Sequence, residues 1–235
     1  MHSVMSHAEQ EQHWNTTQLL QPVQQPLWRI WTYEAPAVVL GCAQNTWYDD
    51  VIRRAPHGVA CVKREAGGGV VLTGPWMVSA SVVLPLDHPW VRGGLIDSYR
   101  ALGELHALVL QQHGITAQAL TTQDVAAARQ GRHANAPAWA CFGGLSHGEV
   151  VDAEGRKLVG LAQRRRRNGV LLVAGTLVSK VPWALLCTAL DHPQDAALLA
   201  GCTVSMEELL GHPCASATVA AQLDQYETEM DRVVT

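Results

Sequence analysis

The chain has 235 residues, of which 48% are hydrophobic and 16% are charged, so it is long enough for one sizeable core and a single domain is expected. Its net charge of -4 and isoelectric point near 6.2 exclude a global basic field and argue against a nucleic-acid partner. No stretch approaches the roughly 18 apolar residues that span a bilayer. Because the polar N-terminus also lacks the apolar core of a secretory signal, we expect a cytoplasmic protein with no membrane partner.

The cysteines are scattered along the chain, at Cys42, Cys61, Cys141, Cys187, Cys202 and Cys214. None forms a Cys-x-x-Cys pair, and no Cys/His cluster has the spacing of zinc ligands, so no metal site is expected. A disulfide framework is not expected in a chain of this size, and we predict reduced thiols.

The first third of the chain predicts strands joined by short turns. Residues 1–26 are interpreted as an N-terminal extension, in which 1–13 are either a frayed helix or disordered and a short helix over 14–25 ends near two prolines. Runs of β-branched and apolar residues then predict strands over 27–33, 36–40, 57–64, 70–72 and 78–84, with a helix over 48–55.

The remainder mixes helices with a long hairpin. Helical spacing of apolar residues predicts a core-packing helix over 95–113, which Gly114 ends. Residues 117–138 lack apolar periodicity and are interpreted as a loop with one helical turn, either a lid or an insertion. Strands over 156–163 and 170–178 flank a predicted turn at 164–169, and helices are expected over 182–191, from Ser205 and over 216–231.

A glycine-rich segment lies between two of the predicted strands. Gly67, Gly68 and Gly69 leave the backbone without side chains, which permits positive φ angles and close approach of main-chain amides to a bound group. Arg64 places a cation just before them. By itself the segment is better interpreted as a flexible turn in a hairpin.

A second segment, over 155–178, changes the interpretation because the two together resemble the lipoate-protein ligase and octanoyltransferase family. The matching residues are Arg64 with the three glycines, and then Gly155, Lys157, Gly160, Ala162, Gln163, Gly175, Thr176 and Leu177. An upstream Gly-x-x-Gln-Asn match is formed by Gly41, Gln44 and Asn45. The resemblance covers roughly residues 36 to 180.

The resemblance implies a fold and a set of binding residues. The expected fold is α/β of the α+β type, a mixed, largely antiparallel sheet with packed helices, like the catalytic domain shared by biotin and lipoate ligases and class II aminoacyl-tRNA synthetases. It implies one catalytic domain over 27–235 without a complete C-terminal accessory domain. The implied acyl- or nucleotide-binding residues are Gln44, Asn45, Arg64, Gly67, Gly68, Gly69, Val70, Gly160, Ala162 and Gln163. By strand position, Val70, Val71, Val78 and Leu161 are candidate walls of an acyl tunnel.

Two residues are expected to carry the chemistry. From its pattern alone, Lys157 is either solvated on the outward face of a strand or directed at an anion. The resemblance implies that it approaches the acyl carbonyl, where an ammonium stabilises the negative charge that develops during acyl transfer. Cys141 lies in a Cys-Phe segment that resembles the nucleophile of the cysteine-dependent octanoyltransferases, although a structural cysteine fits the same position.

Three functions remain open from the sequence. In a transferase, an acyl carrier protein passes an octanoyl or lipoyl group to Cys141, and a lysine of a lipoyl domain or of a glycine-cleavage H-type protein then takes it without a cofactor. In a ligase, ATP with Mg and free lipoate form an adenylate held by the glycine loop, Arg64 and Lys157. Thr73 and Ala174 stand where the family often has His, so a non-catalytic acyl-binding protein is the third.

The predicted turn contributes four consecutive arginines, over 164–167. Such a cluster either binds a phosphate or an acidic partner surface, or is a solvated turn without a ligand. The sequence does not distinguish the two.

Overall fold

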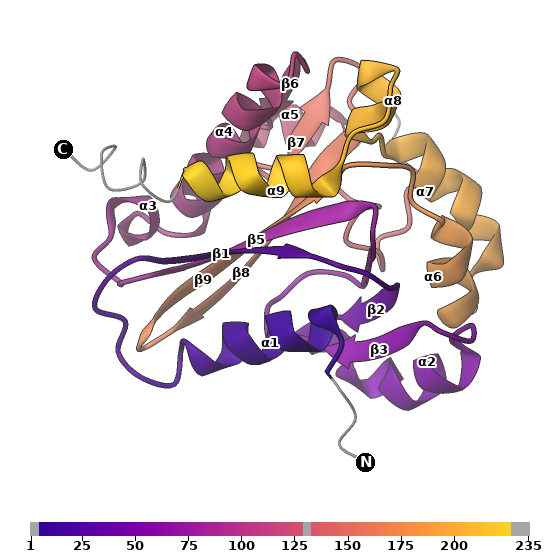
Figure 1. The fold of residues 1–235 in the computed structure, drawn as a ribbon, viewed down its shortest axis with the longest axis horizontal. Helices are drawn as coiled ribbons and strands as arrows, with labels where there is room; N and C mark the ends of the chain where they lie inside the picture. The colour runs from indigo at the N-terminus through magenta and orange to yellow at the C-terminus, as the bar shows by residue number, and fades with distance from the viewer. Residues whose placement is uncertain (1–4, 129–132, 227–235) are drawn as a thin grey trace.

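The computed structural model describes residues 5–128 and 133–226, which form two β-sheets surrounded by helices (Figure 1). The strands are β1 Leu27–Thr32, β2 Ala37–Leu40, β3 Ala60–Lys63, β4 Val71–Thr73, β5 Met77–Leu84, β6 Ala117–Ala119, β7 Val150–Asp152, β8 Lys157–Arg166 and β9 Gly169–Leu177. The helices are α1 His7–Thr17, α2 Tyr48–Arg54, α3 Pro89–Arg92, α4 Leu95–Gln112, α5 Thr122–Ala128, α6 Trp183–Ala189, α7 Ala196–Cys202, α8 Met206–Leu210 and α9 Ser216–Gln225. Short 3₁₀ turns occur at Cys42–Trp47 and Pro193–Asp195.

The larger sheet has six strands in the order β1-β5-β9-β8-β7-β6, and every neighbouring pair is antiparallel. The smaller sheet has the order β3-β2-β4, in which β2 and β3 are parallel and β2 and β4 are antiparallel. The predicted mixed, largely antiparallel architecture with packed helices is therefore confirmed. The strands are divided over two sheets, however, because Gly74 and Pro75 separate β4 from β5 and proline has no N–H for a ladder.

The core lies where the sheets and helices meet. Strand β5 is buried along its whole length, and β9 and β1 flank it. Helices α1 and α9 lie on opposite sides of these strands in Figure 1, and α4 packs along β6, β7, β8 and β9. Strands this uniformly buried place their ends, rather than their faces, at the surface.

The N-terminal segment differs from its sequence prediction. The helix begins at His7 rather than at residue 14, and Ser6 and Glu9 form a capping box at its start. The predicted helix over 14–25 starts too late because the apolar periodicity of α1 is weak, while its capping signal begins at Ser6, eight residues before Trp14. The helix packs against β1 and β3.

Two further differences concern loops. Residues 117–138 contain β6 and α5 rather than one helical turn, and the part of that segment at 129–132 lies outside the described residues. Strand β8 continues through Arg166, so the hairpin turn is shorter than predicted. The predicted capping box at Ser205 and Glu208 is present at α8. Among the helices of residues 5–128 and 133–226, none combines the length and apolar character of a membrane span.

Candidate active site

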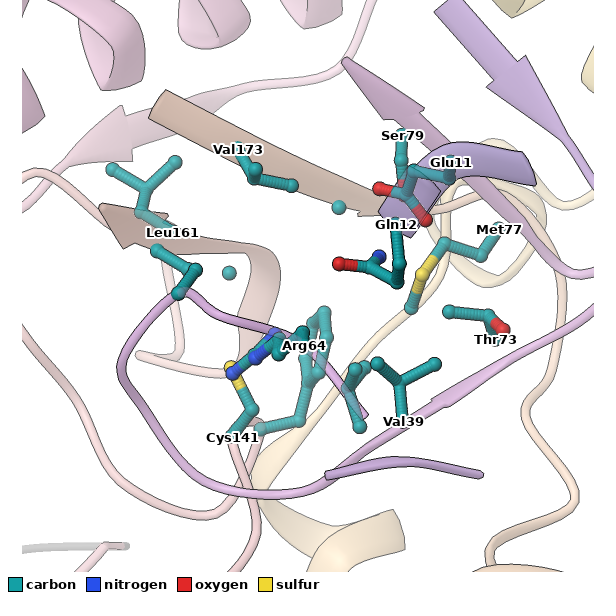
Figure 2. A pocket seen from close by; sticks show the side chains of 16 residues that line it. Glu11, Gln12, Val39, Arg64, Thr73, Met77, Ser79, Cys141, Leu161 and Val173 are labelled. Atoms are coloured by element: carbon teal, nitrogen blue, oxygen red, sulfur yellow. The ribbon is translucent and has the colours of Figure 1, made fainter. Parts of the chain in front are cut away.

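A small cavity opens between the two sheets and α1 (Figure 2). Most of its wall is apolar, and a few polar groups converge on it. The lining residues are Glu11, Gln12, Val39, Arg64, Ala66, Val71, Thr73, Met77, Ser79, Cys141, Phe142, Gly160, Leu161, Ala162, Val173 and Gly175. Such a cavity suits an apolar chain with a polar head.

Backbone hydrogen bonds hold Cys141 at the wall of this cavity. Val70 and Ala140 form a parallel β-bridge, in which the Cys141 N–H donates to the Val70 carbonyl at 2.8 Å. The Val70 N–H donates in turn to the Trp139 carbonyl at 2.9 Å. Val70 itself is fully buried and does not line the cavity. This strand-like pairing therefore ties the cysteine segment, residues 139–142, to the end of the glycine-rich loop, 70 residues earlier in the chain (140 − 70).

The glycine loop makes this close approach possible. A Cβ atom at Gly69 would lie 2.5 Å from the Trp139 carbonyl oxygen and 2.7 Å from the Cys141 nitrogen, which no real Cβ does. Gly68 has a φ of 93°, a conformation that favours glycine. The loop thus acts at least as a packing device that brings Cys141 to the cavity, and it does not line the cavity at Gly67, Gly68 or Gly69.

Two polar side chains from segments that follow strands of the smaller sheet hydrogen-bond to the same segment. Arg64 comes directly after β3, and Gln44 lies in the 3₁₀ turn after β2. Arg64, which is 7% exposed, donates from Nη2 to the Gly69 carbonyl at 2.8 Å. Gln44 donates from Nε2 to the Trp139 carbonyl at 2.9 Å. Both were predicted from the sequence as binding residues. Arg64 lines the cavity, whereas Gln44 does not.

Lys157 is buried beneath the cysteine segment and the two glycines that follow it, with only 1% of its side chain exposed. Its Nζ donates to the carbonyl oxygens of Cys141 at 2.7 Å and Gly144 at 3.0 Å. It also lies 2.5 Å from Oε1 of Glu149. These partners can take all three ammonium hydrogens, and Lys157 does not line the cavity.

Glu149 completes this buried pair and was not found from the sequence. Its carboxylate accepts from the backbone N–H groups of Ser146 at 2.7 Å and Leu161 at 3.2 Å. Burial raises the pKa of Glu149, and the Lys157 ammonium opposes that rise. The available signal was indirect: a lysine buried in a strand requires a counter-charge, and Glu149 immediately precedes the neighbouring strand β7.

Helix α1 contributes Glu11 and Gln12 to the cavity wall, which the sequence reading also missed. Figure 2 shows Glu11 and Ser79 on the side of the cavity away from Cys141. The Tyr33 hydroxyl donates to Glu11 Oε2 at 2.8 Å and lies 2.7 Å from Ser79 Oγ. Burial raises the pKa of Glu11 from its ordinary value of 4.5 to about 7, while Tyr33 and Arg64 oppose the rise.

The other predicted residues fall into two groups. Gly160, Ala162 and the predicted wall residue Leu161 line the cavity from β8, and the predicted wall residue Val71 lines it from β4. Val78, also predicted as a wall, is buried in β5 and does not line it. Thr73, which departs from the family pattern, lines the cavity and donates to the Ala37 carbonyl at 3.3 Å.

An open groove adjoins the cavity, and the predicted binding residues Asn45, Gly67 and Gln163 line it. We call it the cationic groove; it is lined by Cys42, Asn45, Lys63, Arg64, Glu65, Gly67, Gln163, Arg164, Arg165 and Arg166. Arg64 lines both the groove and the cavity, so the two adjoin at its side chain. Within the described part of the chain, no cluster of three or more His, Cys, Asp or Glu side chains could hold a metal ion.

Comparison with known proteins identifies the fold and the family. The model of the lipoyl protein ligase A/B catalytic domain matches residues 7–224, which include α1, the glycine loop, Cys141 and Lys157. The chain belongs to this family. The lipoyl protein ligase A/B match therefore begins at the helix that supplies Glu11 to the cavity, upstream of residue 27, where the sequence placed the start of the catalytic domain.

Relatives of known function are octanoyltransferases. The chain is 32% identical over 172 residues to octanoyltransferase LipM of Moorella thermoacetica, covering 73% of this chain and 60% of the relative. It is 29% identical over 205 residues to octanoyltransferase LipM of Kyrpidia tusciae, covering 84% and 73%. The chain thus spans less than two thirds of the Moorella relative's length.

Solved structures of the same fold include lipoate-protein ligases. A bi-partite lipoate protein ligase from Thermoplasma acidophilum superposes with a TM-score of 0.65 at 16% identity, covering 93% of this chain and 76% of that one. A lipoate-protein ligase A bound with ATP superposes with a TM-score of 0.64 at 16% identity, covering 96% and 81%. At these identities the likeness establishes the fold.

Proposed function

We propose that this protein transfers an octanoyl or lipoyl group to a lysine of a lipoyl domain or a glycine-cleavage H-type protein, through a thioester on Cys141. The observation that carries the proposal is the placement of Cys141. Among the cysteines of residues 5–128 and 133–226, Cys141 is the one that lines the mainly apolar cavity. Backbone pairing with the end of the glycine loop holds it there. The octanoyltransferase relatives support the same reaction.

The reaction has two balanced steps. In the first, the Cys141 thiolate attacks the carbonyl carbon of an acyl thioester on an acyl carrier protein; a new C–S bond forms, and the carrier leaves as its thiolate. In the second, the amine of the acceptor lysine attacks the Cys141 thioester, an amide forms, and the thiolate of Cys141 leaves. The amine's surplus proton returns to a thiolate, so neither step consumes a cofactor.

We assign the recognition of the acyl chain to the cavity. Val71, Leu161 and Ala162 supply apolar wall, and Gly160 leaves space on β8. Arg64 presents its guanidinium near the cysteine side, where it favours negative charge on the carbonyl oxygen. Asn45, Gly67 and Gln163 lie in the groove and would meet the donor beyond the acyl group.

Lys157 acts in this proposal from beneath the cysteine segment. Its ammonium holds the carbonyls of Cys141 and Gly144, and so sets the position of the nucleophile. The family resemblance implies a more direct role, polarisation of the acyl carbonyl. That role requires the ammonium to exchange one of its carbonyl partners for the substrate oxygen.

A ligase is the second candidate, and the cationic groove is the observation that favours it. Phosphates of ATP, with Mg, would find five cationic side chains there beside the glycine loop. In that reaction lipoate forms an adenylate, the acceptor lysine attacks it directly, and Cys141 has no covalent role.

Intact mass spectrometry distinguishes the candidates. The wild type and Cys141→Ala are incubated with octanoyl-acyl carrier protein, with Cys61→Ala as a matched control because Cys61 is half-buried and lies outside the cavity. The proposal expects an octanoyl adduct on the wild type and Cys61→Ala but not on Cys141→Ala. Absence of an adduct on the wild type overturns it; lipoate-dependent pyrophosphate release from ATP then supports the ligase, and its absence leaves a non-catalytic acyl-binding protein.

A further inference from the structure

The cationic groove has a charge that the rest of the chain does not share. Lys63, Arg64, Arg164, Arg165 and Arg166 line it, opposed by the single carboxylate of Glu65. The whole chain carries a net charge of -4. A concentration of cations on a protein of the opposite net charge marks this surface as an attractor for an anionic partner.

The cations of the groove differ in how far they are already neutralised. Arg164 lies 2.8 Å from the Glu65 carboxylate and also donates to the Glu65 backbone carbonyl. Arg165 donates to the Val91 carbonyl at 2.8 Å. Arg166 is exposed, and its side chain makes no ion pair or hydrogen bond with another side chain or carbonyl among the described residues, while its backbone pairs with Gly169 in the β8–β9 ladder. Lys63 lies 4.1 Å from the centre of the Tyr48 ring, a contact that leaves its charge uncompensated.

The hairpin β8–β9 explains why these arginines face one groove. Strand β8 runs unbroken from Lys157 through Arg166, so it extends from beneath the cysteine segment to the surface. Gly160 and Ala162 of this strand line the cavity, and Gln163 to Arg166 line the groove. One strand therefore carries both the acyl site and the cationic surface, in that order.

We propose that the cationic groove is the docking site of the acyl donor, an acidic acyl carrier protein whose phosphorylated prosthetic arm enters the cavity past Arg64. This inference rests on the proposed transferase and names where its donor binds. A carrier of this kind presents an acidic surface, and a phosphodiester in its arm lies between that surface and the thioester. Arg64 is shared by groove and cavity, so the arm passes a cation on its way to Cys141.

The chemistry of the groove favours the donor over the acceptor. The acceptor must bring a lysine to the acyl-enzyme, and the five cations of the groove that adjoins the cavity at Arg64 repel a lysine ammonium. A phosphodiester gains from the same cations, particularly from arginines that can bind it in a bidentate manner.

The test measures binding separately from transfer. The 235-residue chain carrying Cys141→Ala is titrated with octanoyl-acyl carrier protein, alone and combined with Arg166→Glu or with Arg167→Glu. Arg167 is the matched control, because it is exposed in the same hairpin and does not line the groove. We expect Arg166→Glu to weaken binding about 10-fold and Arg167→Glu less than about 3-fold, and we expect higher salt to reduce the difference.

Transfer assays add a donor without charge. Octanoyl N-acetylcysteamine thioester has neither phosphate nor carrier. In the protein that retains Cys141, Arg166→Glu is expected to raise KM for the carrier thioester about 10-fold more than it raises KM for this small thioester. If the small thioester forms the Cys141 adduct and Arg166→Glu leaves carrier binding unchanged, the docking proposal is wrong and the transferase stands. If neither donor forms an adduct, the transferase fails, and the titration still decides whether the groove binds the carrier.

Other occupants give distinct results in the same titration. If an apo lipoyl domain, and not the carrier, loses binding on Arg166→Glu, the groove receives the acceptor and the proposal is overturned. Tight binding of inorganic pyrophosphate together with no carrier binding also overturns it, in favour of a nucleotide.

Discussion

The ammonium of Lys157 lies 2.7 Å from the carbonyl oxygen of Cys141 and 2.5 Å from Oε1 of Glu149. The buried ion pair therefore holds the backbone of the proposed nucleophile directly. Lys157 does not line the cavity, and Cys141 does. A charge pair beneath the cysteine segment and a glycine loop beside it together determine where the thiol lies.

Removal of Lys157 should test this arrangement. Lys157→Met leaves the Glu149 carboxylate buried without its partner, so we expect the free energy of unfolding to fall by about 3–5 kcal/mol. Lys157→Met with Glu149→Gln removes both charges and should recover much of that loss in urea unfolding. If Lys157 positions Cys141, the double variant should remain slow in adduct formation, with the defect in kcat rather than KM. A double variant with wild-type kcat would contradict the positioning role.

The close approach at Gly69 gives a second prediction. Gly69→Ala places a methyl group 2.5 Å from the Trp139 carbonyl oxygen, so the cysteine segment must move. We expect a loss of about 1–3 kcal/mol in unfolding free energy, as for overpacking, and strongly reduced acylation of Cys141. Gly201→Ala in α7 is the control, because a Cβ there meets no atom within 4 Å. Equal acylation rates in the two variants would show that the close approach does not matter.

Ionisation of Glu11 should lower the free energy of unfolding as the pH rises towards neutrality. The pKa of Glu11 in the fold, about 7, lies above its ordinary value of 4.5, because burial disfavours the charged carboxylate. The folded state therefore holds the proton more tightly, and this stability is fully present below about pH 4.5 and is lost as the pH rises through about 7. The loss amounts to at most about 3 kcal/mol.

Glu11→Gln should remove that dependence while it keeps a hydrogen-bonding side chain beside Tyr33. Urea unfolding at pH 5 and pH 8 is the measurement. We expect the difference between the two pH values to be smaller in the variant than in the wild type. Parallel behaviour of both proteins would mean that Glu11 does not titrate in this window.

Protonation of His106 should lower the free energy of unfolding at acid pH. Burial in α4 lowers the pKa of His106 from 6.5 to about 4, although its Nδ1 lies 2.9 Å from the Leu102 carbonyl. The unfolded chain therefore takes up the proton first, so stability present above pH 6.5 is lost as the pH falls towards 4. His106→Leu should reduce the acid loss seen in unfolding between pH 7 and pH 5. His57→Gln, at an exposed position, should behave like the wild type.

Local patterns in the sequence determined much of the secondary structure. Helix α4 ends where Gly114 predicted, and β5 and β9 coincide with apolar, β-branched runs. The Ser205 capping box is present at α8. Such signals concern residues a few positions apart, so they can be read without knowing the fold. The glycine loop, Arg64 and Cys141 were singled out by resemblance; the tertiary structure places Arg64 and Cys141 at one cavity and packs the glycine loop against the cysteine segment.

Only the tertiary structure decided which of these residues line the cavity and which hold the backbone around it. It pairs Val70 with Ala140 and thereby shows Gly69 as a site of backbone contact. It encloses Lys157 with Glu149 away from the cavity, and it brings Glu11 of α1 to the cavity wall. The arginines of β8 likewise proved to line one groove that shares Arg64 with the cavity. The physical reason is that periodicity reports whether a side chain is buried, whereas its partners depend on strand pairings between residues far apart in the chain.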